Sequence, residues 1–116
     1  MIDIIYDKMN EDSFILQYNK SIYIPGSFYI KFPNYPELAF FKAIMEKHPK
    51  IQFESEEESG YTIYYNYKID KKGFSIVYDK DYDLISFETD AKSRKAIAEY
   101  LAQIIERHHS KSHYDI

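Results

Sequence analysis

The strongest constraint on the fold is a strict two-residue alternation of side chains between residues 61 and 69. Hydrophobic side chains occupy every second position, which is the period of a β-strand with one face against a core. Tyr61, Ile63, Tyr65, Tyr67 and Ile69 form the expected inner set, and Thr62, Tyr64, Asn66 and Lys68 form the outer set. We therefore predict a strand here and expect most of its tyrosines to belong to the core.

Two more strands follow, each after a short turn. The first turn, "DKKG", has Asp70 at a favourable starting position and Gly73, which is free to adopt a positive φ. The segments 74–78 and 84–89 then repeat the alternation. Strands joined by such tight turns must be antiparallel.

The rest of the chain predicts four further strands and two helices. The strands are expected at 2–6, 13–18, 27–32 and 51–55, and the helices at 36–48 and 91–108. In both helices apolar residues recur every three or four positions, so each has one face for a core. Asp90 is the expected N-cap of the second helix, and the residues from 110 onward are expected to fray. This order of elements predicts an α+β fold, a single antiparallel sheet of about five to seven strands with two helices packed on it.

Length and composition place limits on domain number and compartment. The 116 residues suit one domain, 1–116, and an aromatic content of 18% favours sheet. Cysteine is absent, which removes disulfides and thiolate chemistry and suits the cytoplasm. The start "MIDIIYDK" is too acidic for a signal peptide, and the longest uncharged stretch, 21–30, is too short to span a bilayer. We expect a cytoplasmic protein without membrane contact.

No motif indicates catalysis, a metal or a cofactor. The acids of residues 79–90 match several positions of a calcium-binding EF-hand loop, but Leu84 stands where that loop needs glycine. His109 and His113 have the spacing of metal ligands on a helix, yet no second ligand cluster accompanies them. We therefore expect no catalytic residue, no metal site and no cofactor.

Direct nucleic-acid binding is disfavoured by charge and by sequence. A net charge of −4 opposes binding to a phosphate backbone. The segment "KGFSIVYD", 72–79, is similar to the first ribonucleoprotein motif of RNA-recognition domains, but Ile76 and Asp79 replace its later aromatic residues. RNA binding is therefore only a weaker alternative.

A candidate partner surface lies on the outer face of the predicted sheet. Tyr64, Val77 and Leu84 are apolar or aromatic there, and Tyr29 joins them if its strand belongs to the same sheet. Acidic residues collect in segments that we expect to be flanking loops. An apolar centre with a polar rim is typical of an interface, and negative charge attracts a basic partner. The candidate partner-binding residues are Glu56, Glu57, Glu58, Tyr64, Val77, Asp79, Asp81, Asp83 and Leu84.

Small size, acidity, the absence of cysteine and the lack of a catalytic motif together resemble the immunity proteins of bacterial contact-dependent growth inhibition and polymorphic toxin systems. The resemblance implies a cytoplasmic protein that blocks a cognate toxin domain, commonly a basic nuclease, by covering its active site. It concerns the general character of the chain and transfers no individual residue. The alternatives are a homo-oligomeric binding or regulatory domain that buries Tyr64 against its own copy, and an enzyme with an unrecognised site.

Overall fold

The computed structural model describes residues 2–18 and 38–114, apart from the side chains of Tyr18 and of residues 108–114. The elements are β1 (Ile2–Tyr6), β2 (Ser13–Tyr18), α1 (Leu38–Lys47), β3 (Ile51–Ser59), β4 (Thr62–Ile69), β5 (Lys72–Asp79), β6 (Leu84–Thr89) and α2 (Arg94–Tyr114). The six described strands form one antiparallel sheet in the order β1-β2-β6-β5-β4-β3. The predicted α+β fold, a single antiparallel sheet with two helices, is confirmed.

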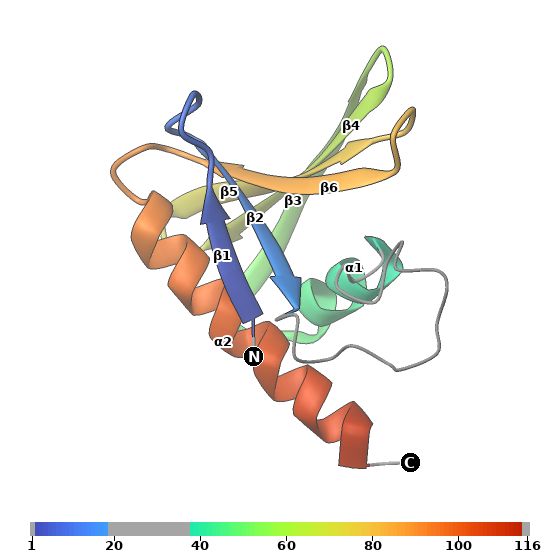
Figure 1. The fold of residues 1–116 in the computed structure, drawn as a ribbon, viewed down its shortest axis with the longest axis vertical. Helices are drawn as coiled ribbons and strands as arrows, with labels where there is room; N and C mark the ends of the chain where they lie inside the picture. Colours follow the sequence, from blue (N-terminus) through green and yellow to red (C-terminus); the bar gives the residue numbers. More distant parts are fainter. Residues whose placement is uncertain (1, 19–37, 115–116) are drawn as a thin grey trace.

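Both helices lie on the same face of the sheet (Figure 1). The helix α2 lies against β1, β2 and β6, whereas α1 lies against β3 and contacts α2. Within the described ranges no helix covers the opposite face, which we call the outer face. The hairpins β3–β4 and β5–β6 project beyond both helices (Figure 1). Neither described helix is long and apolar enough to cross a membrane.

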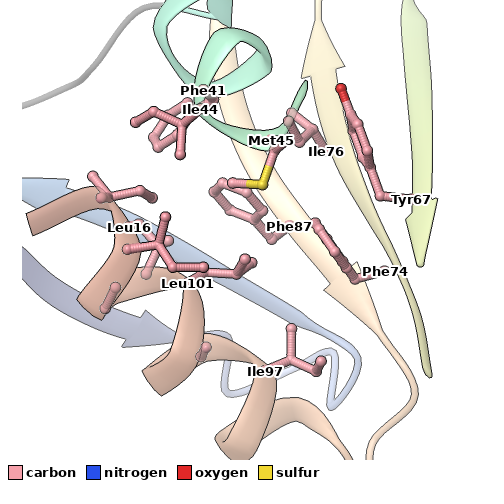
Figure 2. Close-up of a cluster of buried hydrophobic side chains, with 14 of the residues drawn as sticks. Leu16, Phe41, Ile44, Met45, Tyr67, Phe74, Ile76, Phe87, Ile97 and Leu101 are labelled. Atoms are coloured by element: carbon pink, nitrogen blue, oxygen red, sulfur yellow. The ribbon is translucent and has the colours of Figure 1, made fainter. Parts of the chain in front are cut away.

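The hydrophobic core fills the space between the inner face and the two helices (Figure 2). At its centre Phe87 stacks on Phe14, with ring centroids 5.3 Å apart, and meets the edge of Phe41 at 5.2 Å. These rings link β6, β2 and α1, so three elements distant in sequence share one packing unit. The largest fully buried side chains are Tyr67, Phe14, Phe41, Phe87, Leu16, Met45, Ile76, Leu101 and Ile105. The inner positions of Tyr65 and Tyr67 are confirmed, since both are buried.

The helix α2 differs from the prediction at both ends. Asp90 accepts a hydrogen bond from the backbone N of Lys92 at 2.9 Å, so it caps a turn rather than the helix itself. The carbonyl of Ser93 accepts from the N of Ile97 at 2.9 Å, and the regular helix begins at Arg94. At the other end the helix continues to Tyr114, so the expected end near residue 108 is wrong, whereas the fraying of the last residues stays a prediction.

The turn between β4 and β5 also corrects a prediction. It consists of Asp70 and Lys71, because Ile69 pairs with Lys72. The positive φ, 55°, falls on Asp70, whereas Gly73 lies inside β5 without one. Aspartate tolerates this left-handed conformation because its short polar side chain can form local hydrogen bonds.

Some predicted features lie outside the described residues. They are the strand at 27–32 with Tyr29, and the expected first turn of α1 around Pro36.

The burial of α2 leads to a first prediction about stability. Leu101 has no exposed surface and packs between α2 and the sheet, so Leu101→Ala should lower the free energy of unfolding by about 2–5 kcal/mol through lost contacts and a residual cavity. Gln103→Ala, on the exposed side of the same helix, is the control and should change it by less than about 0.5 kcal/mol. Urea unfolding followed by circular dichroism measures both. Similar values for the two variants would contradict the packing of α2.

Candidate partner-binding surface

Side chains on the outer face form rows that cross the strands. Glu57 is opposite Tyr64, Tyr64 is opposite Val77, and Val77 is opposite Ser86. Tyr64, Val77 and Ser86 are half-buried because neighbouring rows shield them, whereas Glu57 is exposed. The structure thus brings together Tyr64 and Val77, two of the residues that alternation had placed on this face.

The next row lies closer to the hairpin tips. Pairing places Thr62 opposite Asp79, and Asp79 opposite Leu84. Leu84 is 51% exposed, so the predicted outer position of this leucine is what the structure shows. Leu84 is the apolar member of this row and lies diagonally across from Val77, at the end of the sheet.

Two hairpin tips lie side by side at this end (Figure 1). The backbone N of Lys80 donates to the carbonyl of Tyr61 at 2.8 Å, and the Lys80 ammonium forms an ion pair with Glu58. Tyr61 is 68% exposed and Tyr82 is 74% exposed. Large aromatic side chains in exposed turns, next to the apolar residues of the outer face, are candidates for contact with another molecule. We refer to these residues as the tyrosine patch, which comprises Tyr61, Tyr64, Val77, Tyr82 and Leu84.

The prediction that Tyr61 belongs to the core-facing set is wrong. Ser59 pairs with Thr62, so Gly60 and Tyr61 form a two-residue turn and the alternation of β4 starts only at Thr62. Gly60 takes a φ of 60°, which glycine adopts at little cost. The dipeptide Gly60-Tyr61 was the available sequence signal, since glycine followed by any residue suits a two-residue hairpin turn. No comparable sequence pattern marks Tyr82, and the binding residues predicted from the sequence did not include it.

The acidic run after residue 53 lies in a strand rather than in a loop, which corrects a second prediction. Paired residues continue from Ser55 to Ser59, so β3 does not end at residue 55. A β-bulge between Phe53 and Ser55 takes up Glu54. An inserted residue shifts the alternation of the strand, and the bulge thereby decides which glutamates reach which face.

The bulge sends the glutamates of β3 to both faces. Glu57 reaches the outer face beside Tyr64, whereas Glu56 pairs with Tyr65 on the inner side. Burial raises the pKa of Tyr65, and the charges of Glu56 and Glu58 raise it further. Glu56, Glu57 and Glu58 are all exposed, so the edge of the sheet carries negative charge on both faces.

The three aspartates near the second tip have different roles. Asp79 Oδ1 accepts hydrogen bonds from the backbone N of Asp81 at 2.9 Å and of Tyr82 at 3.3 Å. Asp83, with a φ of 53°, accepts a hydrogen bond from the Tyr78 hydroxyl at 2.7 Å, which raises the pKa of Tyr78. Asp79 and Asp83 therefore shape the turn that presents Tyr82, while Asp81 is simply exposed.

A polar groove of about 580 Å³ opens at the opposite end of the outer face. Within it Asn66 Nδ2 donates to Ser55 Oγ at 3.0 Å, and Ser75 Oγ donates to Asn66 Oδ1 at 2.5 Å. Glu88 follows Ser75 in the same row. These two bonds join Ser55, Asn66 and Ser75 across three strands, so this part of the groove is a structural network. In the described part of the chain no group of three histidines or acids is placed to hold a metal ion.

Glu88 gives a prediction about pH. Burial raises the pKa of Glu88, and the neighbouring Asp12 raises it further, so folding favours the neutral form. The stability that Glu88 contributes is present in acid and is lost as pH rises through its folded-state pKa. Glu88→Gln, which is neutral at all pH values, should therefore raise the melting temperature at pH 7 and leave it unchanged near pH 3. Glu57→Gln on the exposed end of the face is the control, and a lower melting temperature for Glu88→Gln at pH 7 would refute the sign.

Comparison with known proteins returned no relative. No protein-family model, no curated protein and no solved structure matches the chain. What this surface binds must therefore follow from its own chemistry.

Proposed function

We propose that this protein binds and blocks a basic protein, as the immunity proteins of contact-dependent growth inhibition and polymorphic toxin systems block their toxin domains. The observation that carries the proposal is the meeting of exposed tyrosines and acids at one end of the sheet, next to an outer face without a described helix. Tyrosine contributes a large contact area with few rotatable bonds, and it is enriched among residues that dominate binding energy. Carboxylates select a positively charged partner and speed its approach.

The same chemistry supports a nuclease domain as the partner. A nuclease active site attracts phosphate through lysines and arginines. The carboxylates of Glu57 and Asp81 flank the tyrosine patch. They can pair with those lysines and arginines in place of the phosphate groups of a nucleic acid. Exposed rings such as Tyr82 can occupy the flat surfaces on which bases stack. A protein seated in this way excludes the nucleic acid without reacting with it.

The proposal is tested with the product of the adjacent gene. Its C-terminal domain is purified, its binding to the full chain is measured by surface plasmon resonance, and its nuclease activity is assayed on DNA and RNA. We expect a one-to-one complex that weakens at higher salt, and loss of nuclease activity at equal concentrations. Absence of binding at low and at high salt would overturn the proposal.

Self-association is the competing use of the tyrosine patch. Two copies facing each other through it would bring Glu57 and Asp81 of one copy near those of the other, which opposes the contact. We therefore expect a monomer by light scattering at about 100 µM, a concentration at which most specific interfaces form. A dimer that separates on substitution of Tyr64 would favour the oligomeric alternative instead.

A further inference from the structure

β3 is an edge strand of the described sheet. It pairs with β4 on one side, and no other described strand pairs with its far side. In an antiparallel ladder alternate residues direct their N–H and C=O groups to opposite sides, so half of those in β3 point away from β4. The strand has nine residues, and its register is unbroken from Ser55 to Ser59. A long, regular edge is a template for another strand.

The charge of this edge determines what kind of strand it accepts. From Ser55 to Ser59 the strand contains only serine and glutamate, so an added apolar strand would find no apolar side chain beside it. Glu57 projects to the outer face and Glu56 to the inner side, so an added strand meets a carboxylate on each of its faces. Cross-strand pairs of opposite charge are favourable. The edge therefore selects lysine and arginine on both faces of the incoming strand.

A second copy of the chain does not fit the edge. Antiparallel pairing of two β3 strands about a two-fold axis would set one glutamate run against the other. Like charges opposite each other across strands are destabilising. Glu58 is partly neutralised by its ion pair with Lys80, but Glu56 and Glu57 would still face their counterparts.

We propose that the Ser55–Ser59 edge of β3 receives an extended basic segment of the partner as an additional strand. The inference deepens the proposed function, on which it rests for the nature of the partner. The edge leads directly into the turn at Gly60-Tyr61, so a segment lying along β3 ends beside the tyrosine patch. Main-chain hydrogen bonds provide the attachment, and the glutamates provide the charge selectivity.

The probe is a synthetic nine-residue peptide that alternates lysine with valine or threonine. Added to the full, isotopically labelled protein at low salt, it should bind through main-chain hydrogen bonds with a dissociation constant below about 1 mM. It should slow hydrogen exchange at alternate amides of β3 by about tenfold or more. The same peptide with N-methylated backbone amides keeps its charges but cannot donate main-chain hydrogen bonds. Its binding should therefore be weaker by about tenfold or more. Equal binding of both peptides, or no protection of β3, would overturn the inference.

Charge selectivity is tested by two matched variants. Glu57→Lys lies on the edge, whereas Asp81→Lys makes the same charge change at the neighbouring tip. The edge variant should weaken binding of the peptide several-fold more than the tip variant, because only the edge residue becomes a cross-strand neighbour. Equal weakening would show that the peptide follows the general negative field, which overturns the inference. Peptide binding on β3 together with no binding of the adjacent gene product would show that the edge accepts a basic strand and would remove the proposed function.

Discussion

Replacement of Phe87 by alanine should lower the free energy of unfolding by about 3–5 kcal/mol, which is a large part of the stability of a domain of this size. The Phe87 ring has no exposed surface and lies between the ring of Phe14 and the edge of Phe41. Its loss removes two aromatic contacts at once and leaves a cavity between β2, β6 and α1. The register of β2 with β6 covers two residue pairs and is the shortest described pairing in the sheet, so the ring also supports this joint.

Phe53→Ala is the matched control for Phe87→Ala. Phe53 is 52% exposed on the edge strand and meets Tyr67 edge-on, with centroids 5.5 Å apart. We expect its removal to cost less than about 1 kcal/mol, since half of the side chain is already in water. Urea unfolding monitored by circular dichroism compares both. Equal losses for the two phenylalanines would contradict the assignment of Phe87 to the centre of the core.

The sequence was sufficient for the elements whose periodicity is continuous. The alternation in β4 and β5 predicted that Tyr67, Phe74 and Ile76 face the core, and all three are buried. The helical spacing in α2 likewise predicted the burial of Ile97 and Leu101. In these segments a single buried face decides the position of every second or every third to fourth side chain, so the local pattern carries the tertiary information.

Local pattern was insufficient where one residue breaks the period. The bulge at Glu54 shifts the alternation of β3, and the resulting run of glutamates has no apolar face by which a strand is recognised. Its strand conformation comes from pairing with β4 across the two-residue turn at Gly60-Tyr61. The prediction for Tyr61 was wrong for the opposite reason. Tyr61 continues the apolar alternation of β4 in the sequence, but it lies in the turn that precedes the strand.

The sequence predicted several residues of the candidate surface, but it did not predict how they are arranged. Alternation placed Tyr64 and Val77 on the outer face, but only the register of β4 with β5 makes them direct neighbours. The two hairpin tips are adjacent because β4 pairs with β5 as far as Thr62 and Asp79, and the hydrogen bond from Lys80 to Tyr61 continues that pairing into the tips. Register and tip contacts arise from the whole sheet, so the exposure of Tyr82 and its place in the tyrosine patch followed only from the structure.

Tyr64→Ala should weaken binding of the cognate toxin domain by about 2 kcal/mol or more, equivalent to about thirtyfold in the dissociation constant. Tyr64 is the largest side chain in its row and is half-buried between Glu57 and Val77, so its ring is held in place before the partner arrives. A preorganised ring loses little conformational entropy on binding. Because such an anchor acts in the formed complex, the change should appear mainly as faster dissociation.

Charge reversal at the rim should have the opposite kinetic signature. The double variant Glu57→Lys with Asp81→Lys removes negative charge that acts before contact, so it should slow association and reduce its dependence on salt while dissociation changes less. Glu99→Lys, on the exposed side of α2, alters charge far from the outer face and is the control. Surface plasmon resonance with the adjacent toxin domain at two salt concentrations separates the rates. If Tyr64→Ala and the rim reversal both leave the rates unchanged while Glu99→Lys alters them, the interface lies on the helical side and the tyrosine patch is not the binding surface.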